Sequence, residues 1–226
     1  LLELQRLQKF KTLCHFSTSE VYGTSVMDEM NEDHPLNPTT PYAAGKLAAD
    51  VAVLSYHKTF DLDAFIVRPF NNFGPRQNYM PPLAGIIPLT ITRILSNLPP
   101  IIHGDGLQSR DFIYVKDTIE GFIKIFNNEE TIGQEINIAS GESVSIRELL
   151  DLIVDIMKVK IEIKEEKSRI RPDSSEVDKL IGNNKKIKDL VGWTSKYNLR
   201  DGLTETIEWL KEPKNLAKYK TSIYNI

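Results

Sequence analysis

The sequence predicts an α/β fold in which parallel strands are joined by helical crossovers. Two short apolar runs, 13–16 and 64–67, have the length and composition of buried strands. A long segment of helical composition, 42–60, lies between them, and this alternation favours a parallel sheet. The 226 residues are 41% hydrophobic and 26% charged, which is ordinary globular composition and excludes disorder, collagen and coiled coil as the main state.

The first seventy residues supply the clearest elements. Apolar residues recur at helical spacing in 1–10, and 13–16 reads as a buried strand that runs into a polar loop. Residues 27–40 are rich in Asp, Glu, Asn and Pro and predict a surface loop. A long helix with many small residues then covers 42–60, and 64–67 is the second strand.

After Pro69 the pattern changes, and 71–75 has the composition of a loop. Ser145 and Glu148 form a capping box that opens a helix ending at Met157. Further helices are predicted over 87–98, the later part of 112–126, 185–191 and 201–210. Further strands are predicted at 101–103, the start of 112–126, 136–139 and 160–164, and the tail 214–226 is polar and expected to be loosely held.

Charge and composition narrow the function classes. The net charge of −3 gives no reason to expect binding to nucleic acid or to an acidic membrane. No apolar run is long enough to cross a bilayer, and no signal-peptide pattern is present. The single cysteine, Cys14, precludes an intrachain disulfide and favours a reducing, cytoplasmic compartment. The four histidines are scattered, so no metal site is predicted.

The strongest local motif is Tyr42-Ala-Ala-Gly-Lys46. A tyrosine and a lysine four residues apart share one face of a helix, and an ammonium near a phenol favours the phenolate. Such a tyrosine can take a proton from a hydroxyl while hydride leaves the same carbon. Taken alone the motif is weak, because both residues also suit an ordinary helix surface.

A second motif, Ser17-Thr-Ser-Glu-Val-Tyr-Gly23, directly follows the first strand. Active-site groups of doubly wound sheets lie at the carboxyl ends of strands. The hydroxyl and carboxyl groups of Thr18, Ser19 and Glu20 suit proton transfer there, so the two motifs together favour a catalytic site over a polar turn.

Together these residues resemble the extended short-chain dehydrogenases/reductases, specifically the NAD-dependent nucleotide-sugar epimerases and dehydratases. The resemblance runs from about Phe16 to Trp209 and includes further blocks in the family's order. These blocks are Arg-Pro-Phe-Asn-Asn-Phe-Gly-Pro-Arg at 68–76, Ser-Arg-Asp-Phe-Ile-Tyr-Val at 109–115, Arg-Pro at 171–172, Ser-Glu-Val-Asp at 175–178 and Gly-Trp at 192–193.

The resemblance implies a role for each matching residue. Thr18 would hydrogen-bond the sugar 4-hydroxyl, Tyr42 would deprotonate it, and Lys46 would hold the cofactor ribose; Ser17 and Pro69 would also border the cofactor. On the substrate side, Asn71 would meet the sugar diphosphate, Arg110 and Arg171 would pair with the pyrophosphate, and Glu176 would accept a hydrogen bond from the nucleotide ribose. The implied cofactor is NAD, with NADP left open, and the implied partners are a nucleotide-diphosphate sugar and a second copy of the chain in a homodimer.

Among family members the Thr18-Ser19-Glu20 form resembles GDP-mannose 4,6-dehydratase and also UDP-glucuronate decarboxylase. The Arg-Pro and Ser-Glu-Val-Asp blocks resemble the GDP-mannose enzymes and, even more, UDP-N-acetylglucosamine 4,6-dehydratases, so the resemblance favours a 4,6-dehydratase of polysaccharide biosynthesis. In the implied reaction the sugar is oxidised at C4, Glu20 removes the C5 proton, Glu20 or Ser19 assists loss of the 6-hydroxyl as water, and hydride returns to C6. A UDP-sugar 4-epimerase and a UDP-glucuronate decarboxylase remain alternatives on the same scaffold. A non-catalytic nucleotide-sugar-binding relative or an inactive fragment is the alternative from another class.

The family's glycine-rich fingerprint is absent, because none of the 12 glycines makes the Gly-x-x-Gly-x-x-Gly spacing. The chain also begins with Leu1 in place of Met. We therefore expect a truncated chain that is inactive alone. Residues 1–70 would be the remaining half of a Rossmann-type doubly wound NAD-binding domain. Residues 71–212 would be mostly a smaller α/β substrate-binding domain with some segments returning to the sheet, and 213–226 a tail.

Overall fold

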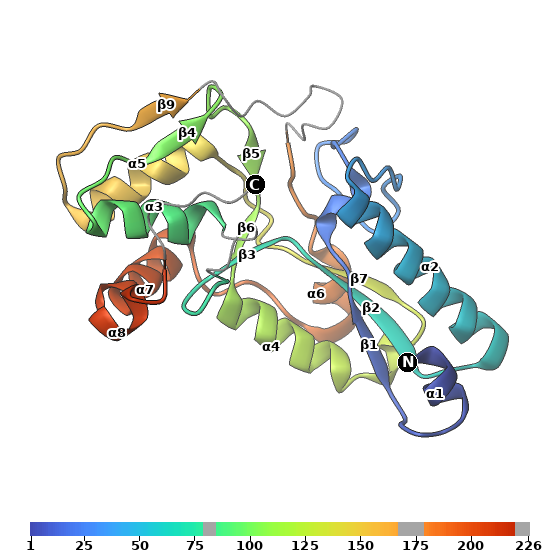
Figure 1. Cartoon of the computed structure of the whole chain (residues 1–226). Helices are drawn as coiled ribbons and strands as arrows, with labels where there is room; N and C mark the ends of the chain where they lie inside the picture. Colours follow the sequence, from blue (N-terminus) through green and yellow to red (C-terminus); the bar gives the residue numbers. More distant parts are fainter. Residues whose placement is uncertain (79–84, 167–178, 220–226) are drawn as a thin grey trace.

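A computed structural model describes residues 1–78, 85–166 and 179–219. Its main sheet is parallel, with the strand order β1 (Leu13–Phe16), β2 (Ala64–Pro69) and β7 (Glu135–Ile138). Helix α2 (Pro41–Phe60) forms the crossover from β1 to β2 and runs along the sheet (Figure 1). The predicted α/β class with parallel strands is therefore confirmed.

The sheet is covered on both faces, as parallel sheets require. Side chains of a strand point alternately to its two faces, and β2 uses both faces for burial. Ile66 shares a core cluster with Val53 of α2, whereas Val67 shares one with Ile125 of α4 (Val115–Phe126). Helix α6 (Lys185–Val191) contributes Ile187 to that second cluster.

A second body of helices packs around its own core on the side of the molecule away from α2 (Figure 1). Its helices are α3 (Ile86–Leu95), α5 (Ile146–Met157) and α7 (Leu199–Lys211). Three strand pairs accompany them: β3 (Asn71–Phe73) with β6 (Phe112–Tyr114), β4 (Ile101–His103) with β9 (Lys164–Glu166), and β5 (Ser109–Arg110) with β8 (Val144–Ser145). The short helices are α1 (Leu2–Arg6), η1 (Ser19–Tyr22), η2 (Glu129–Thr131) and α8 (Pro213–Leu216).

Three local expectations were wrong. Residues 71–73 form strand β3 instead of a loop, because they pair in parallel with 112–114. The strand expected over 160–164 begins only at Lys164 and pairs with Ile101. The loop 27–40 does not lie wholly at the surface, since Met30 and His34 are buried.

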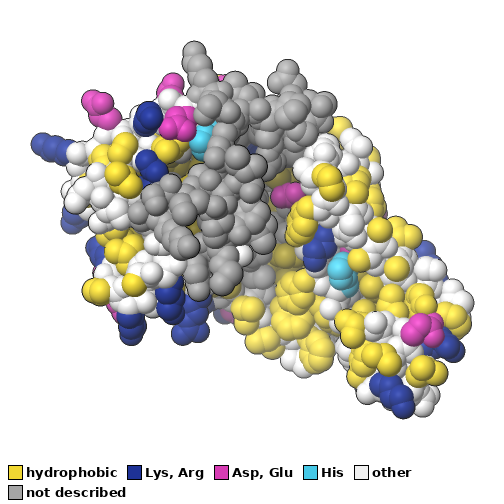
Figure 2. Space-filling view, viewed as in Figure 1, with side chains coloured by type: hydrophobic (Ala, Val, Ile, Leu, Met, Phe, Trp, Pro, Cys, Tyr) yellow, Lys and Arg dark blue, Asp and Glu magenta, His cyan; other side chains and the backbone are white. Residues whose placement is uncertain are grey.

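Part of the tail is helical, since α8 forms and residues up to 219 are described; residues 220–226 lie outside the described part. Within the described residues, no helix combines the length and apolar character needed to span a membrane. Hydrophobic side chains gather on the surface over α4 (Figure 2), where Ile119, Ile123 and Phe126 are about half exposed. The domain boundaries near residues 70 and 212 stay predictions.

Candidate active site

The carboxyl end of β1 and the first turns of α2 meet at one place in the fold. The Lys46 Nζ of α2 donates a hydrogen bond of 2.8 Å to the carbonyl oxygen of Phe16, the last residue of β1. The turn η1 starts three residues later and packs against α2. This contact therefore joins the two motifs that the sequence analysis singled out.

The turn after β1 is built around Thr18. Its Oγ1 accepts a hydrogen bond of 3.3 Å from the backbone N–H of Glu20 and so caps η1. Within η1 the Ser19 side chain is buried, whereas Glu20 is partly exposed. A partly exposed carboxylate beside a hydroxyl can exchange protons with a molecule bound at this turn.

Helix α2 begins with a sequence that fixes the place of Tyr42. Thr40 caps the helix by accepting a hydrogen bond from the N–H of Ala43, and Pro41 occupies the first turn, where its missing N–H costs nothing. Tyr42 is 56% exposed, and within the described part of the chain its hydroxyl has no hydrogen-bond partner. The phenol is thus free to meet a ligand, one helical turn before Lys46.

The two other residues expected near a cofactor lie at the same edge of the sheet. Ser17 follows β1 and donates a hydrogen bond of 2.9 Å to Asp50 of α2. Pro69 ends β2, opposite Ile138. Both therefore lie at the carboxyl end of the parallel sheet, the usual ligand edge of this architecture.

The residues expected to bind substrate fall into two groups. Asn71 and Arg110 are described and half-buried: both the backbone N–H and the side-chain amide of Asn71 donate to the carbonyl of Asp111, and Arg110 Nη1 donates to the carbonyl of Ser109. Asp111 thus links the two. Arg171 and Glu176 lie outside the described residues.

Asp111 itself escaped the sequence analysis, although it lies inside a motif block. It is fully buried, and its carboxylate accepts from the backbone N–H groups of Ser140, Gly141 and Gly182 and from the Ser140 hydroxyl. Burial raises its pKa, an effect that these hydrogen bonds oppose. The sequence signal was its position directly after Arg110.

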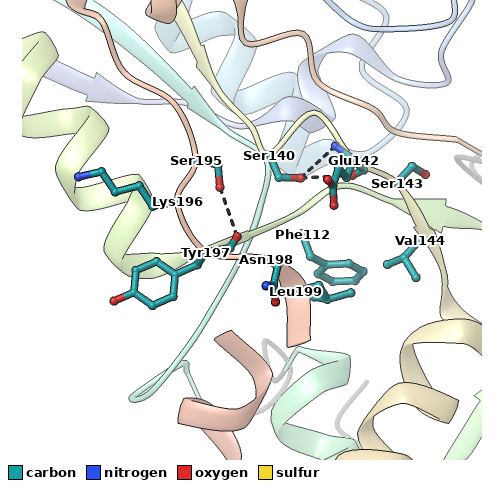
Figure 3. A pocket seen from close by; sticks show the side chains of 10 residues that line it. All are labelled: Phe112, Ser140, Glu142, Ser143, Val144, Ser195, Lys196, Tyr197, Asn198 and Leu199. Carbon is teal, nitrogen blue, oxygen red and sulfur yellow. Dashed lines mark hydrogen bonds between the residues drawn. The ribbon is translucent and has the colours of Figure 1, made fainter. Parts of the chain in front are cut away.

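A cavity of about 280 Å³ lies elsewhere, lined by Phe112, by residues of the 140–144 loop and by the segment 195–199 (Figure 3). None of the predicted site residues lines it. The hydroxyls of Ser140 and Ser195 are already bonded to Asp111 and Asp117. The cavity is also slightly smaller than typical ligand pockets, whose volumes start at about 300 Å³. It therefore gives no reason to place the candidate active site there.

Among the described residues no group of three or more His, Cys, Asp or Glu side chains is placed to hold a metal ion.

Comparison with known proteins supports the family that the sequence motifs indicate. The family model described as GDP-mannose 4,6 dehydratase matches residues 1–206. UDP-glucose 4-epimerase of Mycolicibacterium smegmatis is 30% identical over 212 residues, which cover 93% of this chain and 66% of that protein.

Two solved structures share the fold. One is dTDP-glucose 4,6-dehydratase of Bacillus anthracis in complex with NAD, with a TM-score of 0.83 and 28% identity, covering 94% of this chain and 66% of that one. The other is UDP-glucuronic acid 4-epimerase of Bacillus cereus in complex with UDP-glucuronic acid and NAD, with a TM-score of 0.85 and 30% identity, covering 94% of this chain and 65% of that one.

The chain spans about two thirds of the length of these relatives, and 57% of the human dTDP-D-glucose 4,6-dehydratase that it also matches. The match nevertheless extends over nearly all of the chain and includes both motifs at the carboxyl end of β1 and the start of α2. The chain therefore belongs to the nucleotide-sugar dehydratase/epimerase family of the extended short-chain dehydrogenases/reductases.

Proposed function

We propose that the full-length gene product containing these residues is a nucleotide-sugar 4,6-dehydratase, which makes a 4-keto-6-deoxy sugar nucleotide. The observation that carries this proposal is the Lys46 contact with Phe16, since it brings the helix of Tyr42 against the turn of Thr18 and Glu20. An epimerase needs the phenol and the hydroxyl, whereas a dehydratase needs a carboxylate as well, and Glu20 supplies one.

In this proposal Tyr42 carries out the proton transfer at the 4-hydroxyl, and Glu20 those at C5. Thr18 orients the sugar 4-hydroxyl and Tyr42 removes its proton, with Lys46 one helical turn away. The resulting 4-ketone acidifies C5, from which Glu20 takes the proton. Glu20 or Ser19 then gives a proton to the departing 6-hydroxyl, which leaves as water, and Glu20 regains a proton from solvent and passes it to C5.

The residues present fit one end of NAD. Ser17, Lys46 and Pro69 lie at the carboxyl end of the sheet beside exposed Tyr42 and would border the nicotinamide ribose. A glycine-rich loop for the pyrophosphate is not among these 226 residues. The chemistry that bound NAD supplies is reversible hydride transfer, at C4 and then at C6. We accordingly propose that the 226 residues are inactive without a segment that cradles the pyrophosphate.

The substrate side of the proposal rests on Asn71 and Arg110, with Arg171 and Glu176 as further candidates. A guanidinium forms paired hydrogen bonds to phosphate oxygens, which suits a nucleotide diphosphate. Asn71 is placed by its two bonds to Asp111, and Arg110 precedes Asp111 in the chain. Both proposed binding residues therefore adjoin Asp111, Asn71 through hydrogen bonds to its backbone carbonyl and Arg110 through the chain.

The test is to incubate the full-length gene product with NAD and, separately, UDP-N-acetylglucosamine, UDP-glucuronate, GDP-mannose and dTDP-glucose, and to weigh the products. Loss of water from one of them supports the dehydratase. An unchanged mass with an inverted C4 identifies the epimerase, the second candidate, which the relatives from Mycolicibacterium smegmatis and Bacillus cereus favour. Loss of carbon dioxide identifies a decarboxylase.

Two variants separate catalysis from binding. Glu20→Gln should lower the rate of dehydration by about 10²- to 10⁴-fold, the usual contribution of a general acid–base. Glu130→Gln, an exposed carboxylate of η2, is the matched control and should leave the rate unchanged. A Glu20→Gln protein of full activity would contradict the dehydratase mechanism.

Assembly as a cytoplasmic homodimer through α2 is also part of the proposal. Ala44, Ala48 and Val51 are exposed on this helix, and such small or apolar residues permit close helix packing. Val51→Glu should therefore convert dimers to monomers in light scattering, whereas an unchanged dimer would exclude this face.

A further inference from the structure

Arg68 is a buried cation that the proposed mechanism does not use. It is the penultimate residue of β2, near the carboxyl end of the strand, and only 1% of its side chain is exposed. Burying a guanidinium costs several kcal/mol of hydration unless its donors are well paired, so its partners matter. Those partners come from both elements that carry the candidate catalytic residues.

On one side Arg68 holds α2. Its Nε and Nη2 donate to Oδ2 of Asp50 at 3.1 and 3.0 Å, and the same oxygen accepts from Ser17 at 2.9 Å. Asp50 is 1% exposed, and it lies one turn after Lys46 and two turns after Tyr42. The ion pair therefore fixes the helix face that presents both candidate residues.

On the other side Arg68 holds η1. Its Nη1 donates to the Tyr22 hydroxyl at 3.1 Å, and its guanidinium lies over the Tyr22 ring, 5.2 Å from the centroid. The Tyr22 hydroxyl in turn donates to Asn137 of β7 at 2.8 Å. Tyr22 is the last residue of the turn that begins with Ser19 and Glu20.

The Tyr22 hydroxyl can accept the bond from Arg68 and donate the bond to Asn137 because it keeps its proton. Burial raises the pKa of Tyr22 to about 12, which Arg68 partly offsets. A neutral phenol accepts from the arginine and donates to the amide oxygen at the same time. Buried polar networks of this kind specify one arrangement of the elements that they join.

We propose that Arg68 is a positioning residue that locks the Glu20 turn to the Tyr42 helix, through Tyr22 on one side and Asp50 on the other. The inference rests on the proposed function, because it assigns the two tied elements to successive steps at C4 and C5. Breaking the bond between Arg68 and Tyr22 should leave Tyr42 and Lys46 in place, since the bonds from Arg68 to Asp50 remain. Such a change should slow only the step that needs Glu20.

The test compares Tyr22→Phe with Tyr114→Phe in the full-length gene product. Each change removes one hydroxyl from a buried tyrosine, and the Tyr114 hydroxyl donates to Glu205 of α7, far along the chain from the candidate site. We expect Tyr22→Phe to lower kcat by about 10- to 100-fold with KM for the sugar nucleotide within about twofold. Tyr114→Phe should leave kcat unchanged.

Isotope effects separate positioning from a general loss of structure. With Tyr22→Phe, the effect of deuterium at sugar C5 should rise and the effect at C4 should fall, because the Glu20 step becomes limiting. The double variant Asp50→Asn/Arg68→Met removes both charges together and should slow both steps. Equal losses of kcat in the two Tyr→Phe variants, or unchanged isotope effects, would overturn the inference.

Amide hydrogen exchange tests the inference without measuring enzymatic activity. Tyr22→Phe should speed amide exchange in residues 18–23 but not in the first three turns of α2. Unchanged exchange in 18–23 would overturn the lock even if the protein proves to be an epimerase. If the unaltered protein forms no 4-keto-6-deoxy product, the proposed dehydratase function is overturned. The hydrogen-exchange result alone would then show whether Arg68 and Tyr22 hold the turn in place.

Discussion

Replacing Asp111 by Asn should destabilise the protein by about 1.5 kcal/mol. The two carboxylate oxygens receive four hydrogen bonds: Oδ1 accepts from the N–H and hydroxyl of Ser140, and Oδ2 accepts from the N–H groups of Gly141 and Gly182. An asparagine oxygen can keep the N–H groups of Gly141 and Gly182, and the Ser140 hydroxyl can turn to accept from the new NH₂ group, but the Ser140 N–H then loses its acceptor. Leaving this buried donor unpaired costs about 1–3 kcal/mol.

Removing the buried negative charge of Asp111 offsets part of this destabilisation. Burial raises the pKa of Asp111, which means that the protein pays to hold the charged form, and the neutral amide removes that penalty. The net value should therefore fall in the lower half of the range. Urea unfolding followed by the fluorescence of buried Trp193 measures it.

A matched control is Asp105→Asn, since Asp105 is exposed and accepts a single hydrogen bond from the N–H of Leu107 through Oδ1, which an amide oxygen can replace. That change should stay within about 0.5 kcal/mol. A loss below about 1 kcal/mol for Asp111→Asn would refute the idea that this carboxylate holds the backbone at Ser140, Gly141 and Gly182.

Three more predictions concern single groups. Burial raises the pKa of Cys14 from 9.0 to about 12, which lowers the fraction of reactive thiolate near neutral pH. Alkylation of Cys14 should therefore be roughly 10³-fold slower in the folded than in the urea-unfolded protein, and equal rates would contradict this. Burial also raises the pKa of Glu32, whose Oε1 accepts from the N–H of Asn137. The folded state then binds the proton more tightly, so stability should fall as pH rises from about 4.5 through the raised pKa. Glu32→Gln should reduce that slope in urea titrations, the remainder coming from groups such as Asp111 whose pKa is also raised, and an unchanged slope would contradict the assignment to Glu32. Ser145→Ala removes the Ser145 hydroxyl, which accepts a hydrogen bond from the N–H of Glu148, and leaves the bond from the N–H of residue 145 to the Glu148 carboxylate. The change should cost about 1 kcal/mol, measured as a lower urea midpoint with an unchanged slope.

Local chemistry explains why much of the fold could be predicted. The strands 13–16 and 64–67 are short apolar runs, and the helix 42–60 begins at a Thr-Pro cap, so each carries its own boundary signal. The capping box at Ser145 was confirmed for the same reason, because both of its residues lie within four positions.

Features that depend on distant segments escaped prediction. The pairing that turns 71–73 into a strand joins it to 112–114, and nothing in the Asn71-Asn72-Phe73 sequence itself indicates it. The ion pair between Asp50 and Arg68 joins a helix to a strand, and a charged residue in an apolar run does not reveal its partner. The proposed lock was therefore missed, although Tyr22 and Arg68 both lie inside motif blocks.

The site residues themselves came from motifs, and the structure supplies their setting. Lys46, Thr18 and Glu20 share one end of the fold because β1 and α2 are consecutive, which spacing alone could anticipate. Arg171 and Glu176 lie outside the described residues, so their roles stay predictions.

The most direct measurement of the central claim is the mass of the product formed in heavy water by the full-length gene product with NAD and its sugar nucleotide. If Glu20 takes the C5 proton and later returns one, that proton exchanges with solvent on the carboxylate. The product should then have lost water and gained one deuterium at C5. A product of unchanged mass without deuterium would show that only C4 reacts, and would contradict the dehydratase.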